Sequence, residues 1–487
     1  PGEKLILSYS DTNAKGEGIS PAYLIGSICS LYLKLKIEGG AGVRPHKNSI
    51  NNYCYPENPE AGIDLFLEKL VQETEKEHED ILEQADETDA VFGELYSWYL
   101  RNPEYRSRVQ KLVQSAFAGK PKDIISQSVA KALYGEVSPY SATRLERFAA
   151  CAFAHFLQYG MKLTERVEYE FKPMDMGNVM HEALESFAEE VRKRGMKWTE
   201  LTEQERNEIA DRCLDNIVAD YGNTVLKSSA RNEYMIERTR RILRRTVWAL
   251  QKQLEQGEFQ PEGFEVTFGG GRIDRVDIME DQNKVYVKVI DYKTGNTSFD
   301  LVYLYHGLQL QLMIYLDGAL RVEQKKYPDK EIIPAGVFYY NIKDPMIQEK
   351  IDADVEAVSA GLMKELKMNG LVQADPELVY RMDSSLGSIP VAFNKDGSFR
   401  KNSSVADRTQ FAVLGRYVRT KIEKIRSSIL EGDAEVSPYE LGKKNACTYC
   451  PYMTVCGFDR RLSGYEFRRL KNFSDEELWK AFDREAE

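Results

Sequence analysis

The sequence predicts an α/β fold in which helices flank a central mixed sheet. Two stretches of period two, FEVTFGGGRIDRVDIM and VYVKVIDYKTG, are joined by the short turn EDQNK and predict a β-hairpin over 264–295. The segment GVFYYNI at 336–342 predicts a further strand. Helical periodicity precedes the hairpin over 178–193 and 200–255, and it returns between the strands over 301–324.

Length and charge limit what the chain can be. Its 487 residues exceed what one core ordinarily holds, so two or more domains are expected. The net charge of −11 means that any nucleic-acid binding has to come from a local basic surface. The sequence shows no apolar run of membrane-spanning length and no signal peptide, so we expect a cytoplasmic location. Because the sequence begins at Pro1, we also expect a fragment or a processed chain.

A domain boundary is predicted between residues 135 and 136, at VSPYSATRLERFAAC. Ser138-Pro139 predicts a turn, and Ser141 predicts the N-cap of a helix. The region 1–135 begins with the strand-like EKLILSYS and continues with helical patterns such as SRVQKLVQSAF. The phosphate-binding loop G-x-x-x-x-G-K-[ST] is absent from the sequence, so we expect no ATP motor in this chain.

The end of the second stretch places charged residues on a strand face that is otherwise apolar. Asp291 and Lys293 are two residues apart and therefore share a face with Val285, Val287 and Val289. Charges at the end of a buried valine row are costly unless they are paired or used. The pattern leaves two alternatives, a structural ion pair and a functional site.

Strand alternation separates the two acids of GRIDRVDIM. Asp274 shares a face with Val276 and is predicted to lie beside Asp291, whereas Asp277 shares a face with Arg275 and is predicted to lie in a solvated surface pair. Two neighbouring carboxylates repel each other unless a cation lies between them, and their oxygens suit Mg²⁺ or Mn²⁺. A nearby lysine could then hold a phosphate or orient water. The alternative is a salt bridge that closes the end of the sheet.

The motif GRID…VIDYKTG resembles the metal-binding core of the RecB-type exonucleases in the PD-(D/E)xK superfamily. That family also carries a histidine after a glycine on an upstream helix, and a Gln-x-x-x-Tyr on the helix after the lysine. GNVMHEALESF and QLMIY match both features in the same order. The resemblance implies a PD-(D/E)xK nuclease core with the catalytic residues Asp274, Asp291, Lys293, Gln311 and Tyr315. The metal ligands that it implies are His181, Asp274, Asp291 and the carbonyl group of Tyr292.

The segment CTYCPYMTVC near the C-terminus has a C-x2-C-x5-C pattern that comprises Cys447, Cys450 and Cys456. Three thiolates leave a tetrahedral metal site one ligand short, and Cys151 in LERFAACAF is the best candidate for the fourth. A zinc ion and an iron–sulfur cluster both fit four thiolates chemically. The remaining cysteines have no metal-like spacing.

One early cysteine and a late C-x2-C-x5-C that bracket this core resemble the iron–sulfur staple of the AddB subunits of AddAB helicase–nucleases. The resemblance implies a structural [4Fe–4S] cluster in addition to Mg²⁺ or Mn²⁺. It implies that 136–487 is the nuclease domain and that 1–135 is the C-terminal part of a helicase-like region. Such subunits pair with AddA in the bacterial cytoplasm and degrade the single strand with the 5′ end during double-strand break repair and recombination, and we expect the same here.

Other functions stay open at this point. A smaller family of CRISPR-associated exonucleases shares the iron–sulfur staple, and an inactive nuclease fold or a zinc-stabilised protein could serve as a binding scaffold. The intact set of acids, lysine and histidine argues against an inactive fold. The basic run ERTRRILRRTVW places Arg238, Arg241 and Arg245 on one helical face, which could line a DNA path. A solvated face paired with local acids is the favoured alternative for that run.

Overall fold

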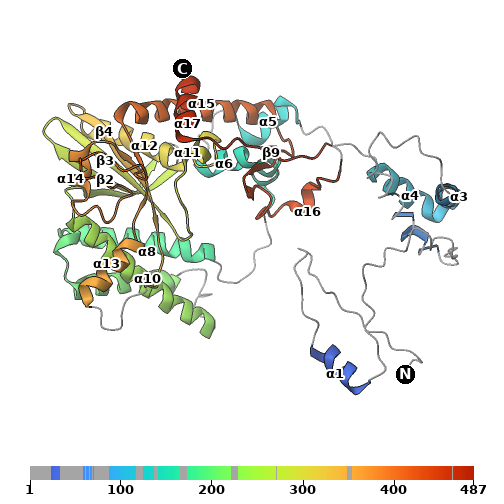
Figure 1. The fold of residues 1–487 in the computed structure, drawn as a ribbon, viewed down its shortest axis with the longest axis horizontal. Coiled ribbons are helices and arrows are strands. Elements are labelled where there is room, and N and C mark those ends of the chain that lie inside the picture. Colours follow the sequence, from blue (N-terminus) through green and yellow to red (C-terminus); the bar gives the residue numbers. More distant parts are fainter. Residues whose placement is uncertain are drawn as a thin grey trace. The chain divides into compact units, whose positions relative to one another are not determined.

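The computed structural model describes most of the chain, and it divides the chain into two compact units, Pro1–Ala118 and Gly119–Glu487. Each unit is treated by itself below (Figure 1). The described residues are 23–32, 59–60, 62–64, 66–67, 70, 87–116, 124–135, 141–164, 173–220, 229–269, 271–347, 354–462 and 464–486.

The first unit is helical wherever it is described in detail. Its helices are α1 (Tyr23–Leu31), α3 (Glu87–Arg101) and α4 (Pro103–Ala116). An aromatic core joins α3 and α4 to a preceding segment, with Phe66 stacked on Phe92 at a ring-centroid distance of 4.8 Å. The pattern SRVQKLVQSAF is thereby confirmed as a helix up to Ala116, whereas the predicted strand EKLILSYS lies outside the described residues. The helicase-like nature of this region stays a prediction.

The division between the units falls earlier in the chain than the predicted 135/136 boundary. The reason is that α5 (Gln127–Tyr134) packs on the second unit, where Ala130 and Tyr134 are buried in its core. Helix α6 (Ala142–Ala150) begins after the predicted N-cap, since the Ser141 side chain accepts a hydrogen bond from the backbone N–H of Arg144 at 3.4 Å. The predicted Ser138-Pro139 turn lies outside the described residues.

The second unit is built on a mixed six-stranded sheet with the order β1-β2-β3-β4-β5-β6. Strand β3 runs parallel to β4, and β5 runs parallel to β6, while the other neighbours are antiparallel. The pair β2–β3 is the predicted hairpin, but its first predicted stretch, FEVTFGGGRIDRVDIM, is divided between the two strands β1 and β2, which pair with each other. The strands are β1 (Gln260–Phe268), β2 (Gly271–Asp281), β3 (Lys284–Lys293), β4 (Glu331–Asn341), β5 (Asn369–Gln373) and β6 (Val405–Ala406).

Helices cover both faces of this sheet (Figure 1), which confirms the predicted α/β class. Helices α8 (Pro173–Lys193), α9 (Glu203–Asp220) and α10 (Ala230–Glu255) belong to one layer, and α12 (Gln311–Lys326) and α15 (Arg408–Glu431) to the other. Strand β3 serves both cores because its side chains alternate. Val285, Val287 and Val289 pack toward α12 and α15, and Tyr286 and Ile290 pack toward α8 and α10. Each fully buried valine contributes about 1.5–3 kcal/mol to this three-layer packing.

The helix predicted over 301–324 is interrupted. Helix α11 (Leu301–Tyr305) ends before Gly307, which has a φ of 79° in the left-handed region that glycine tolerates. Helix α12 then begins at Gln311, and this break sets where the N-terminus of α12 lies. The pattern over 178–193 is confirmed within α8, and 200–255 is confirmed for α9 and α10, with 221–228 outside the described residues.

Smaller elements complete the second unit. They include a three-stranded sheet of order β8-β7-β9, whose strands flank the cysteine-rich segment in the sequence. None of the helices in the described part of the chain is long and apolar enough to cross a membrane. The bounds are α7 (Ala152–His155), the π-helical turn η1 (Phe156–Gly160), η2 (Trp198–Glu200), α13 (Val355–Glu365), α14 (Pro376–Met382), β7 (Tyr439–Leu441), β8 (Lys444–Asn445), α16 (Met453–Cys456), β9 (Arg468–Arg469) and α17 (Asp475–Ala486).

Candidate active site

The β2–β3 hairpin brings the two predicted carboxylates together. The register that pairs Arg275 with Ile290 continues to Asp274 and Asp291, which are 8% and 1% exposed. The Asp274 Oδ2 atom accepts a hydrogen bond of 2.7 Å from the backbone N–H of Tyr292. Burial raises the pKa of Asp291 to about 7, and the charge of Asp274 adds to this rise while Lys293 opposes it. Two buried carboxylates of this kind are stabilised by a cation.

Helix α8 places His181 against the same end of the hairpin. Its Nδ1 atom lies 3.4 Å from Asp274 Oδ2, and its Nε2 atom lies 3.1 Å from the carbonyl oxygen of Tyr292. Burial lowers the pKa of His181, but hydrogen bonds to Asp274 and Glu265 outweigh burial and raise the pKa to about 10. A metal ion would take the place of this proton between the imidazole and the carboxylates.

Glu265 is a site residue that the sequence patterns did not reveal. It lies on β1 opposite Asp274, between the pairs Phe264–Arg275 and Val266–Ile273, and it forms an ion pair with Arg272. Its φ of 50° is rare for a residue other than glycine and turns the local backbone away from regular strand geometry. A signal for it in the sequence is the glycine run between FEVTF and GRID, two segments that the structure pairs as antiparallel strands.

His181, Glu265 and Asp274 form a group whose ligand atoms all lie within 4.8 Å of one another, among the residues that the structure describes. The nearby Tyr292 carbonyl adds a fourth donor, and this mixture of oxygens and one imidazole nitrogen suits a hard divalent cation. Asp291, a predicted ligand, stands outside the 4.8 Å group and contacts Lys293 instead. The donor set fits Mg²⁺ or Mn²⁺, with Glu265 as an additional candidate ligand.

Lys293 connects the carboxylates to helix α12. Its Nζ atom lies 2.6 Å from Asp291 Oδ2, in an ion pair that is not aligned as a hydrogen bond, and it donates to Gln311 Oε1 at 2.8 Å. The Gln311 amide in turn donates to the Tyr315 hydroxyl at 2.9 Å. The predicted lysine, glutamine and tyrosine therefore form one chain of contacts that starts at Asp291.

Glu146 on α6 contacts the start of α12, the helix that carries Gln311 and Tyr315. No sequence pattern singles out this residue. One carboxylate oxygen accepts hydrogen bonds from the backbone N–H groups of Leu310 and Gln311, at 2.7 and 2.9 Å. These are orphan donors at the start of α12, so Glu146 caps that helix. Burial raises the pKa of Glu146 to about 7, against the effect of these hydrogen bonds and of Lys293. A lone acid inside an amphipathic helix carries no sequence signal for such a role.

The expectation that Asp277 lies in a solvated surface pair is wrong. Asp277 is fully buried and contacts Arg275 at 2.6 and 2.9 Å and Lys288 at 2.9 Å. Arg275 also lies over the rings of Trp198 and Phe264, at 5.7 Å in each case. The alternation itself is right, since Asp277 is on the opposite face from Asp274. Because helices cover both faces, that opposite face is a second core rather than the surface.

The four cysteines of the proposed staple line one cavity beside α7 and α16. Cys151 is 8% exposed, and burial raises the pKa of its thiol against the effect of nearby backbone N–H groups. Within the described residues, the sulfurs do not form a group within 4.8 Å of one another, as four thiolates bound at about 2.3 Å to one zinc ion would. The four cysteines are Cys151, Cys447, Cys450 and Cys456.

Comparisons with known proteins agree with this geometry. Residues 139–457 match the model of the PD-(D/E)XK nuclease superfamily. The chain is 38% identical over 511 residues to the AddB subunit of an ATP-dependent helicase/deoxyribonuclease from Lachnoclostridium phytofermentans, in a match that covers 100% of this chain and 42% of that protein. The equivalent subunits from Alkaliphilus metalliredigens and Clostridium acetobutylicum are 32% and 31% identical, over 100% and 99% of this chain and 43% of each relative.

The chain thus spans about two fifths of the length of these curated AddB relatives. The superfamily match includes the whole β2–β3 hairpin, helix α8 with its histidine, and helix α12 with its Gln-x-x-x-Tyr pair. Since that match covers well over half of the sequence, this chain belongs to the PD-(D/E)XK nuclease superfamily.

Proposed function

We propose that this chain hydrolyses phosphodiester bonds of single-stranded DNA with Mg²⁺ or Mn²⁺, as the nuclease part of a helicase–nuclease complex. The observation that carries this proposal is the convergence of His181, Asp274, Asp291 and Lys293 at one end of the β2–β3 hairpin. A purely structural ion pair would need only Asp291 and Lys293. It would not account for a second buried carboxylate and a histidine at the same point.

Each residue has a role in this proposal. His181, Asp274, Asp291 and the Tyr292 carbonyl would hold the metal ion, with Glu265 as a further ligand or as the partner that orients His181. The bound metal supplies Lewis-acid stabilisation of the phosphate and a nucleophilic water at neutral pH. Lys293 binds the scissile phosphate and orients the water.

Helix α12 sets the position of the lysine. Gln311 accepts the Lys293 hydrogen bond, and Tyr315 fixes the amide of Gln311. In this proposal, the two residues would support the lysine or the DNA backbone. Gln311 and Tyr315 are uncharged, so they fix the ammonium group without adding negative charge to that of Asp291, its ion-pair partner.

The second metal centre in the proposal is a structural [4Fe–4S] cluster on the four cysteines. Cys151 follows α6, and the other three lie about 300 residues later, near α16. A cluster there would close a very long loop and hold the C-terminal segment against the nuclease core. The shared cavity supports one metal centre on the four cysteines, and the choice of a cluster over zinc rests on the resemblance to the iron–sulfur staple.

The relatives' names support a subunit of a helicase/deoxyribonuclease, and the rest of the biological setting is proposed from the resemblance alone. We expect an AddA-type partner and a role in double-strand break repair and recombination in the bacterial cytoplasm, with the single strand that carries the 5′ end as substrate. A stand-alone CRISPR-associated exonuclease or an inactive DNA-binding scaffold are the alternatives. The helical region before residue 119 favours a helicase–nuclease subunit over the compact CRISPR-associated enzymes.

Cleavage of a labelled single-stranded oligonucleotide tests the function. The chain should cleave it with Mg²⁺ or Mn²⁺ and stop when a chelator is added. Asp274→Asn and Asp291→Ala should each lower the rate at least a hundredfold with the fold intact, whereas the exposed Asp483→Asn serves as a matched control and should not. Cleavage that persists in the Asp291→Ala protein would refute the assignment.

A further inference from the structure

A groove lined by arginines lies on the α9–α10 layer, outside the candidate active site. It has a volume of about 570 Å³ and is bounded by α9, α10 and α13. Six arginines line it against two acids, Glu203 and Glu237. Because the chain as a whole is acidic, with a net charge of −11, this is a local reversal of charge. The arginines are Arg206, Arg238, Arg240, Arg241, Arg244 and Arg245.

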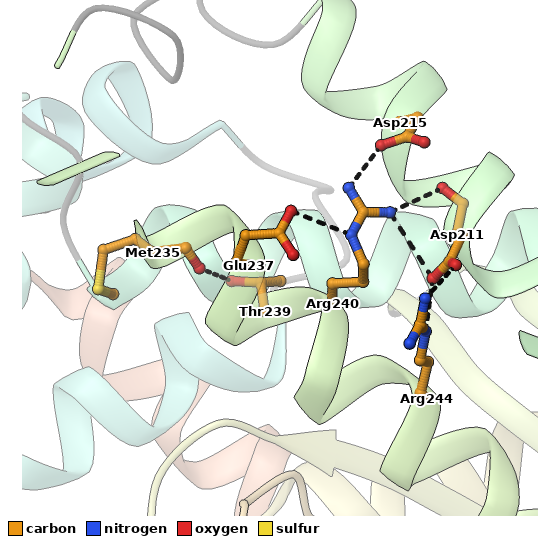
Figure 2. A network of polar contacts seen from close by, with 7 residues as sticks. All are labelled: Asp211, Asp215, Met235, Glu237, Thr239, Arg240 and Arg244. Carbon is orange, nitrogen blue, oxygen red and sulfur yellow. Dashed lines mark hydrogen bonds and ion pairs between the residues drawn. The ribbon is translucent and has the colours of Figure 1, made fainter. Parts of the chain in front are cut away.

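Two of these arginines are already neutralised by acids of the same layer. Figure 2 shows Arg240 directed at Asp211, Asp215 and Glu237, and Arg244 directed at Asp211. The Arg240–Asp215 contact is 2.7 Å. These pairs join α9 to α10, so they have a structural purpose and leave little charge for a ligand.

Three others have no ion-pair partner among the described residues. Arg238 and Arg245 lie on the groove side of α10, and they form no ion pair or hydrogen bond there. Arg206 is only 6% exposed and donates to the neutral Gln251 at 2.6 Å, while its buried Nε atom has no acceptor. A buried guanidinium without a carboxylate is costly, and an anion in the groove would offset that cost.

The groove side of α10 also carries aromatic side chains at both ends of the arginine row. Tyr234, which is 64% exposed, precedes Arg238, and Trp248 follows Arg245. Their spacings of four, three, four and three residues, through Arg241, keep all five on one helical stripe. The stripe is about 21 Å long at the rise of an α-helix. Guanidinium groups between flat rings suit a strand that offers phosphates and unstacked bases together.

The groove is connected to the end of the sheet that carries Lys293. Arg241 donates to Asp344 at 2.7 Å, and Asp344 follows the end of β4. Two residues earlier, the backbone N–H of Ile342 donates to the carbonyl oxygen of Lys293 at 2.7 Å. The middle of the arginine stripe therefore lies beside the segment that leads directly from the candidate active site.

We infer that the α10 stripe of Tyr234, Arg238, Arg241, Arg245 and Trp248 binds single-stranded DNA and guides it along the face of the sheet that α8 and α10 cover. The inference rests on the proposed nuclease function for its substrate, but the binding needs no cleavage. The favoured expectation from the sequence, a solvated face paired with local acids, holds only for Arg241 on this stripe.

Binding of a fluorescein-labelled 20-nucleotide oligothymidylate to the full chain, measured by anisotropy in excess chelator, tests the inference. Arg238→Glu/Arg245→Glu should weaken binding at least tenfold. Each phosphate contact contributes about 0.7 to the steepness of log affinity against log salt concentration for single strands. Because this variant loses two contacts, the steepness should fall by about 1.4. Tyr234→Ala should weaken binding about fivefold or more, through lost stacking.

The matched control is Arg416→Glu/Lys480→Glu, which makes the same charge change at exposed positions of α15 and α17 in the other helical layer. It should stay within twofold of the unaltered chain. Equal affinities of the two double variants would overturn the inference, and they are the result expected if the groove receives an acidic protein surface. Lys293→Ala removes one proposed phosphate contact, so it should weaken DNA binding far less than the groove double variant while it abolishes cleavage. That difference separates the groove from the catalytic proposal.

Discussion

The buried charge cluster at Asp277 makes a prediction opposite to the one that strand alternation alone suggests. Asp277 is the single acid between Arg275 and Lys288, and all three side chains are almost fully buried. Burial raises the pKa of Asp277, but Arg275 and Lys288 outweigh burial and hold it below its usual range. Asp277→Asn keeps the shape of the side chain and removes the carboxylate that pairs with both cations. Among the described residues, it leaves Arg275 and Lys288 without an ion-pair partner, and Asp383 acts on Lys288 only through its more general electrostatic effect.

Removal of one partner from a buried ion pair typically costs about 3–5 kcal/mol of unfolding free energy. We expect Asp277→Asn to fall in that range. Lys288→Met should cost much less, about 1 kcal/mol, because Arg275 and Asp277 remain as a balanced pair joined by two hydrogen bonds of 2.6 and 2.9 Å. The exposed Asp483→Asn is the matched control and should change stability by less than about 0.5 kcal/mol.

Urea unfolding followed by tryptophan fluorescence measures the difference, since Trp198 lies directly against Arg275. At a slope of about 3 kcal/mol per molar urea, the Asp277→Asn midpoint should fall by about 1 M or more. A midpoint equal to that of Asp483→Asn, or higher than that of Lys288→Met, would refute the reasoning. It would mean that water reaches this pair, as strand alternation alone suggests.

Three further predictions concern Glu146, His155 and Cys151. Glu146→Ala should lower the turnover rate about tenfold or more by freeing the start of α12, whereas Glu146→Gln keeps an acceptor oxygen and should retain most activity; equal losses in both would exclude the capping role. Burial, with the charges of Arg144 and Arg147, lowers the pKa of His155 to about 3, from an ordinary value of 6.5. As the pH falls, His155 is protonated in the unfolded chain before it is protonated in the folded chain. The contribution of neutral His155 to the free energy of unfolding is therefore complete above about pH 6.5 and is lost as the pH falls toward 3. The urea midpoint of His155→Phe should fall less over that pH range than the midpoint of the unaltered chain. An equal fall in both proteins would contradict the role given to His155. Anaerobically purified protein should contain about four iron and four sulfide per chain, and Cys151→Ala should lose most of both; one zinc per chain, or full iron in the variant, would contradict the cluster.

The sequence is sufficient to predict the hairpin and its two acids because both depend on local patterns. Period-two alternation and the EDQNK turn set the register, and the register places Asp274 beside Asp291. The helix cap at Ser141 follows from local chemistry in the same way.

The remaining features depend on tertiary packing. Alternation distinguishes the two faces of a strand but does not say whether a face is solvated, and the expectation for Asp277 is wrong for that reason. Glu146 acts because α6 packs at the start of α12, and Glu265 acts because β1 returns beside β2. Neither residue belongs to a sequence motif. Whether Arg238 finds an ion-pair partner likewise depends on which acids α9 brings to α10, and in the described part of the chain it finds none.

The most direct test of the catalytic proposal separates metal binding from cleavage in one variant. Mn²⁺ affinity and single-turnover cleavage of single-stranded DNA should be measured for the unaltered chain and for Lys293→Ala, which keeps His181, Asp274 and Asp291. The account predicts Mn²⁺ affinity within about threefold of the unaltered chain, together with a cleavage rate at least a hundredfold lower. Cleavage by Lys293→Ala at the unaltered rate, or an unaltered chain that binds no Mn²⁺, would contradict the account.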